Sequence, residues 1–139
     1  MAIVHLTRRE RFCSAHKLYN PNWDEAKNLE VFGKCASPNW HGHNYEIWVT
    51  VKGEPNPETG FLINLSHLKD LINERICDKA DHKNLNLDVD FMKGIQTTTE
   101  NLAIVIWKEL EADVKNMGAE LHCVKVQETE NNSVSYYGE

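Results

Sequence analysis

Alternation of apolar and polar residues is clearest after Gly42, where every second residue from His43 to Val51 is a histidine, an aromatic or a β-branched residue. Successive side chains point to opposite faces of a strand, so this pattern predicts a strand with one core-facing side. Residues 3–16 mix β-branched and aromatic residues with polar ones and contain neither glycine nor proline. They predict a second strand.

Two segments follow the period of a helix instead. Ser66 is expected to cap a helix that continues to about Lys79, because leucine and isoleucine recur on one side of it. The spacing of Thr97 and Glu100 fits a capping box for a second helix, which Gly118 would end. A shorter helix is compatible with 24–31, inside a segment interrupted by proline and glycine.

The remaining elements are short. Phe61–Leu65 reads as a strand that follows the turn Gly53–Gly60 and forms a hairpin with the strand before it. Glu120–Glu128 and Ser133–Tyr137 read as a final strand pair, and Asp81–Asp90 is polar and loop-like. Strands and helices occur in runs, which predicts an α+β fold with an antiparallel sheet packed by two helices. The open edges of such a sheet favour a homo-oligomer.

Composition narrows the class of protein. A chain of 139 residues is expected to form one domain, residues 1–139. The net charge of −6 argues against general nucleic-acid binding. No apolar run approaches the length of a membrane span, and no secretory signal is visible at the start, so we expect a cytoplasmic protein without membrane contact. The four scattered cysteines then read as thiols.

Histidines supply the first candidate chemistry. His41 and His43 are two apart on a predicted strand, so their imidazoles should share one face, with Gly42 removing bulk between them. His16 lies at the end of the other predicted strand, although spacing alone cannot bring it within reach. Three neutral imidazoles with a fourth position open are typical of catalytic zinc.

Several other residues have a functional and an ordinary interpretation. Cys35 is a thiol that could act as a base near a metal, or a small buried side chain, and the sequence does not decide between them. Asp81 and His82 could form an acid–imidazole pair that relays a proton, although a solvated polar turn is the simpler interpretation. Glu128 is in phase with apolar residues, so its carboxylate must either bind a cationic side chain or receive donors from a ligand.

The start of the second helix offers two hydroxyl groups. Thr98 and Thr99 could simply cap the helix, or their hydroxyls could contact a ligand. The N–H groups of a helix N-terminus also favour an anionic or acceptor group nearby.

Five short motifs occur in order along the chain. They are Phe12-Cys13-Ser14-Ala15-His16, Cys35-x5-His41-Gly42-His43-Asn44-Tyr45, Asp81-His82-Lys83-Asn84-Leu85, Thr98-Thr99-Glu100-Asn101 and Glu128-Thr129. Together they resemble the 6-pyruvoyl-tetrahydropterin synthase family. The resemblance covers the chain from about Arg11 to the C-terminus, and each motif is modest alone, whereas five in order are specific.

The resemblance implies a tunnelling fold, in which each subunit provides a four-stranded antiparallel sheet with two helices on one face. Three subunits would close a barrel, and two trimers would stack into a homohexamer with active sites between subunits. One zinc ion per subunit would be held by His16, His41 and His43.

The resemblance also implies the site and the reaction. Cys35 would be the catalytic base, Asp81 and His82 a relay pair from a neighbouring subunit, and Glu128 the anchor of the pterin, with Thr98 and Thr99 nearby. The enzyme would be a lyase of tetrahydrobiopterin biosynthesis that converts 7,8-dihydroneopterin triphosphate to 6-pyruvoyl-tetrahydropterin and triphosphate, and Mg²⁺ could accompany the triphosphate.

Two positions depart from the family pattern. Trp40 precedes His41 where the family commonly has glycine, which could narrow the approach to the metal, and His67 stands where many relatives have an acidic residue. Three rival interpretations remain: a 6-carboxy-tetrahydropterin synthase, whose cysteine typically lies closer to the His-Gly-His motif; a relative with glutamate in place of the cysteine; and a non-catalytic zinc-stabilised module.

Overall fold

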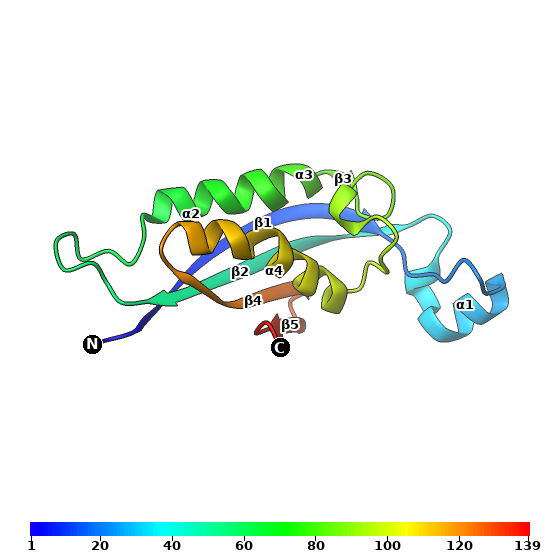
Figure 1. Ribbon diagram of the computed structural model, residues 1–139. Coiled ribbons are helices and arrows are strands. Elements are labelled where there is room, and N and C mark those ends of the chain that lie inside the picture. The colour runs from blue at the N-terminus through cyan, green and yellow to red at the C-terminus, as the bar shows by residue number, and fades with distance from the viewer.

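One sheet forms the centre of the molecule in the computed structural model, which describes residues 1–139 (Figure 1). Its strand order is β3-β1-β2-β4-β5. The strands are β1 (Val4–His16), β2 (His41–Gly53), β3 (Lys83–Asn84), β4 (Glu120–Thr129) and β5 (Asn132–Tyr136). The four longer strands pair antiparallel, whereas the two-residue β3 pairs parallel with the end of β1. The sheet is therefore five-stranded and mixed, and the expectation of four antiparallel strands is wrong on that point.

Strands β1 and β2 pair along their whole length, from Val4 opposite Gly53 to His16 opposite His41. The alternation predicted for β2 is confirmed, because Tyr45 and the aliphatic residues that follow it at every second position are buried. The sheet thus has one face covered by the core and one face largely open.

Two helical segments cover the same face of the sheet in Figure 1, as the sequence predicted. The first runs through α2 (Leu65–Ile72), a π-helical turn (Asn73–Cys77) and α3 (Asp78–Ala80). The second is α4 (Thr99–Asn116). Between them and the sheet lies a single hydrophobic core of 26 buried residues, which fixes the sheet relative to both helices.

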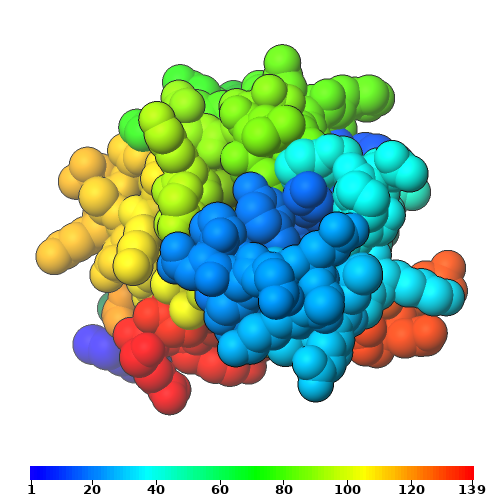
Figure 2. Space-filling model, turned by 90° about the vertical axis from the view of Figure 1, so that its right-hand side faces the viewer, coloured from blue at the N-terminus to red at the C-terminus, as the bar shows by residue number.

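The segment between β1 and β2 contributes no residue to this hydrophobic core. It contains α1 (Glu25–Phe32), which begins at Asp24 as its N-cap, and a 3₁₀ turn over Gly33–Ala36. A second 3₁₀ turn, Asp90–Met92, precedes α4. Figure 2 looks onto the end of the molecule at which β1 ends, and the blue residues of this segment occupy the middle of that end.

The predicted strand Phe61–Leu65 is wrong. Asn64 belongs to the start of α2, where it is the N-cap in place of the predicted Ser66. Its side chain accepts a hydrogen bond from Ser66 N–H at 2.9 Å. Ile63 is 8% exposed while Phe61 is 57% exposed. Ile63 is one of the apolar residues that suggested a strand. It packs into the core from an irregular segment and has no strand partner.

Thr98, and not Thr97, caps α4. The Thr98 hydroxyl accepts a hydrogen bond from Asn101 N–H at 3.2 Å, so the capping box predicted from Thr97 is displaced by one residue. The Thr97 hydroxyl is directed away from the helix, and lies 3.2 Å from both Lys17 O and Asn86 Oδ1. None of the helices combines the length and the apolar composition that crossing a membrane requires.

Candidate active site

Three histidines converge where β1 ends and β2 begins. His16 is the last residue of β1, and it pairs with His41, the first residue of β2. His43 shares the strand face of His41, as predicted. One ring nitrogen from each of the three lies within 4.8 Å of the others. The structure therefore brings together all three predicted metal ligands.

The nitrogens of this cluster fit a metal ion. His16 Nε2, His41 Nδ1 and His43 Nε2 are all buried without a hydrogen-bond partner. Buried polar atoms of this kind need an explanation, and a role as metal ligands is one. Burial, more than any neighbouring charge, lowers the pKa of His16 to about 4, so its ring is neutral near pH 7. A neutral imidazole can donate a lone pair to a metal.

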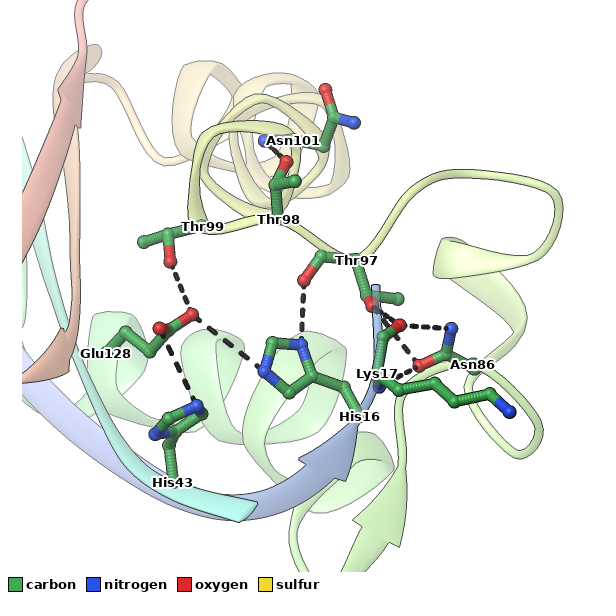
Figure 3. A network of polar contacts seen from close by, with 9 residues as sticks. All are labelled: His16, Lys17, His43, Asn86, Thr97, Thr98, Thr99, Asn101 and Glu128. Atoms are coloured by element: carbon green, nitrogen blue, oxygen red, sulfur yellow. Dashed lines mark hydrogen bonds and ion pairs between the residues drawn. The ribbon is translucent and has the colours of Figure 1, made fainter. Parts of the chain in front are cut away.

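The tautomer of His16 follows from its environment. His16 Nδ1 lies 2.8 Å from the carbonyl oxygen of Thr97 (Figure 3). A carbonyl oxygen only accepts hydrogen bonds, so Nδ1 carries the proton and Nε2 keeps its lone pair. Orientation of a ligand histidine by a backbone carbonyl is typical of metal sites.

Glu128 lies on the open side of the three histidines. Its Oε2 accepts a hydrogen bond from the Thr99 hydroxyl at 2.8 Å and lies 3.9 Å from His16 Nε2. Its Oε1 lies 3.6 Å from His43 Nε2. The Thr99 hydroxyl of α4 therefore provides the partner that a core-facing carboxylate requires. Of the two threonines singled out in the sequence, Thr99 orients Glu128 and Thr98 caps the helix.

A cavity of about 730 Å³ reaches His43 and Glu128, whereas His16 and His41 do not line it. His43 and Glu128 line it together with Asp81, Cys13 and Arg11. It is large enough for a drug-sized ligand, and its lining is mainly polar.

Cys35 lies in the 3₁₀ turn Gly33–Ala36 and is half-buried. Its carbonyl oxygen accepts a hydrogen bond from Leu18 N–H at 2.7 Å, which ties the turn to the residues that follow His16. Burial, together with the charges of Glu128 and Cys35, raises the pKa of Tyr45.

Tyr45 belongs to the site although the functional analysis of the sequence passed over it. Its ring centroid lies 5.6 Å from that of His43, and its buried hydroxyl has no hydrogen-bond partner. The signal was present in the sequence, because Tyr45 continues the alternation of His41 and His43 along one face of β2.

Asp81 and His82 form the predicted acid–imidazole pair. Asp81 Oδ2 lies 3.0 Å from His82 Nδ1, and Asp81 Oδ1 accepts a hydrogen bond from Cys13 N–H at 2.9 Å. That backbone hydrogen bond is the main reason why the pKa of Asp81 is lowered. The His82 side chain is 83% exposed, and no hydrogen bond or ion pair joins the pair to Cys35 within the chain. The pair is thus formed, but one chain does not bring it to the thiol.

The chain matches the family model of 6-pyruvoyl tetrahydropterin synthase over residues 5–139. The chain belongs to this family. A 6-pyruvoyl tetrahydrobiopterin synthase from Dictyostelium discoideum is 47% identical over 136 residues, which cover 98% of this chain and 97% of the relative. A protein of the same name from Homo sapiens is 46% identical, over 98% of this chain and 92% of its own length.

A solved structure leads to the same family. The 6-pyruvoyl tetrahydropterin synthase of Caenorhabditis elegans superposes with a TM-score of 0.92 at 37% identity, covering 100% of this chain and 98% of that one. The resemblance noted from five motifs is therefore confirmed, and the chain is a member of the 6-pyruvoyl tetrahydropterin synthase family of enzymes.

The backbone of Trp40 has an unusual conformation for a residue other than glycine. Trp40 adopts a φ of 64°, in the left-handed region that favours glycine. Its ring packs against the ammonium group of Lys17, with Nζ 4.5 Å from the ring centroid. In Figure 3 the Lys17 side chain extends away from His43 and Glu128.

We expect Trp40→Gly to be more stable than Trp40→Ala by about 1 kcal/mol. Both variants lose the ring and its contact with Lys17, so their difference isolates the cost of the left-handed backbone. Urea unfolding of the two metal-free proteins measures it. An alanine variant as stable as the glycine variant would show that residue 40 does not hold this conformation in solution.

Proposed function

We propose that the chain is a zinc-dependent lyase that converts 7,8-dihydroneopterin triphosphate to 6-pyruvoyl-tetrahydropterin and triphosphate in tetrahydrobiopterin biosynthesis. The observation that carries the proposal is the set of three buried, unpartnered imidazole nitrogens next to the Glu128 carboxylate. Family membership and the names of the relatives support the choice of substrate.

Glu128 is proposed as the pterin anchor. The pyrimidine edge of a pterin presents adjacent N–H groups, and a carboxylate can accept two of them in charge-assisted hydrogen bonds. The Thr99 hydroxyl holds Glu128 Oε2 at 2.8 Å, so the carboxylate is oriented before the substrate arrives. Binding at this residue would place the side chain of the substrate toward the three histidines.

Proton transfer is assigned to Cys35 and His82. As a thiolate, Cys35 would remove a carbon-bound proton from the substrate side chain, and His82, held by Asp81, would assist or return protons. The zinc ion would supply Lewis acidity that makes the hydroxyl and neighbouring C–H protons of the substrate easier to remove. The hydroxyls become ketones while the ring is reduced, so the redox change is internal and requires no nicotinamide.

A homohexamer built from two trimers would complete the site. Within one chain His82 is exposed and has no contact with Cys35, whereas a partner subunit could present its own His82 to this thiol. The exposed backbone at the two sheet edges is compatible with such an assembly.

Product identification tests the proposal. The zinc-loaded protein and a chelator-stripped sample would each receive 7,8-dihydroneopterin triphosphate without oxygen, and mass spectrometry would identify the products. We expect 6-pyruvoyl-tetrahydropterin and triphosphate from the zinc-loaded sample alone. A 6-carboxy-tetrahydropterin or an aldolase-type product would overturn the reaction but not the metal site, and zinc binding without turnover would favour a non-catalytic module.

A further inference from the structure

The connection between β1 and α1 has no secondary structure, yet side-chain amides bind its backbone. Three of its residues each receive an amide whose oxygen accepts from the backbone N–H and whose nitrogen donates to the backbone carbonyl. The pairs are Asn86 on Lys17 (3.1 and 3.0 Å), Gln96 on Tyr19 (3.2 and 2.8 Å) and Asn28 on Asn20 (2.7 and 3.1 Å).

Asn86 differs from the other two amides because it also contacts Thr97. Its Oδ1 also lies 3.2 Å from the hydroxyl of Thr97, and that hydroxyl lies 3.2 Å from the carbonyl oxygen of Lys17. Thr97 is 1% exposed, so its hydroxyl cannot turn to water instead. The amide and the hydroxyl together fix the Thr97 backbone relative to Lys17.

These contacts form a closed series that includes His16. The Thr97 carbonyl receives the His16 Nδ1 proton at 2.8 Å, and Lys17 is covalently joined to His16 (Figure 3). Displacing Thr97 would remove the only acceptor that holds this proton on Nδ1. His16 could then adopt the other tautomer, in which Nε2 carries the proton and cannot bind a metal.

We propose that Asn86 is a positioning residue of the metal site, which clamps Lys17 to Thr97 and thereby keeps the Thr97 carbonyl on His16 Nδ1. The inference rests on the metal-binding part of the proposed function. It concerns how tightly the site binds metal and is independent of the identity of the substrate. An ordinary loop clamp, which Asn28 represents, would stabilise the connection without affecting the tautomer.

Zinc affinity tests the inference through a chelator competition with Zn²⁺ alone, without substrate. Loss of a group that orients a metal ligand typically lowers metal affinity by about 10–100-fold. We expect a loss in this range for Asn86→Ala. The control Asn28→Ala removes the equivalent pair of contacts with Asn20, three residues further along the connection, together with contacts to the carbonyls of Trp23 and Asp24. It should bind Zn²⁺ like the wild type.

Thr97 provides milder variants. Thr97→Val keeps the shape and the carbonyl but lacks the hydroxyl that Asn86 binds, and it should also weaken Zn²⁺ binding. Thr97→Ser retains the hydroxyl and should restore wild-type affinity. This pair keeps the test valid even if Asn86→Ala folds poorly.

The tautomer itself can be observed by ¹⁵N NMR of the metal-free protein. We expect the His16 proton on Nδ1 in the wild type and in Asn28→Ala, and a mixture of tautomers in Asn86→Ala and Thr97→Val. Unchanged Zn²⁺ affinity and unchanged tautomer in these two variants would overturn the inference and leave the proposed function intact. A wild type that does not bind Zn²⁺ would overturn the proposed function, while the NMR measurement would still test the clamp.

Discussion

Replacing Cys35 by alanine is expected to lower kcat by about 10²–10⁴-fold, the usual contribution of a general base. The zinc content should not change, because the three histidines form the metal cluster without a cysteine. Cys35 is half-buried in a short turn, so truncation to alanine removes little packing. Turnover of 7,8-dihydroneopterin triphosphate and metal analysis of the same preparation provide the two measurements.

Cys13 offers the matched control. It is an exposed thiol that lines the cavity next to Asp81, so general loss of a thiol near the site can be separated from loss of the base. Cys13→Ala should retain wild-type turnover. The assignment of Cys35 fails if Cys35→Ala retains full activity, and the roles would be reversed if only Cys13→Ala lost it.

Replacing Glu128 by glutamine should chiefly weaken substrate binding. Hydrogen bonds to a charged group contribute about 1.5–3 kcal/mol, so we expect KM to rise roughly 10–100-fold. Glutamine has the same shape and can still accept from the Thr99 hydroxyl, so the fold should be preserved. Steady-state kinetics separates KM from kcat, and metal analysis checks the effect of removing a carboxylate 3.6 Å from His43 Nε2.

Thr99→Val is the control for orientation. It removes the hydroxyl that donates to Glu128 Oε2 but leaves the carboxylate in place. We expect a smaller rise in KM, about fivefold, in keeping with the loss of one hydrogen bond of about 1 kcal/mol. A Thr99→Val effect as large as that of Glu128→Gln would mean that the hydroxyl itself contacts the pterin.

Short-range periodicity predicted much of the site. His41 and His43 share a face because of the alternation of a strand. The phase of Glu128 with apolar neighbours predicted a cationic partner or a ligand, whereas its partner within the chain is the Thr99 hydroxyl. The proximity of His16 to His41 and His43 could not be predicted from periodicity. It depends on the register that places His16 opposite His41, which is a property of strand pairing.

The errors share a physical cause, because each depends on contacts distant in sequence. Phe61–Leu65 has apolar residues typical of a strand, but Ile63 is buried by the core without pairing in the sheet. Thr97 fits a capping box by spacing, but Lys17 and Asn86 engage its hydroxyl, so Thr98 caps the helix. The two residues of β3 carry no periodicity that could be recognised.

The hydrogen bond between His16 and Thr97 joins residues 81 positions apart. An unfolded chain cannot keep such distant groups together, so the three histidines can form a metal site only in the folded protein. Metal binding and folding are therefore thermodynamically linked. Free metal at 100 times its Kd would add about 2.7 kcal/mol to the free energy of unfolding. The concentration of free metal would then affect the rate at which proteases degrade the chain, in addition to its catalytic rate.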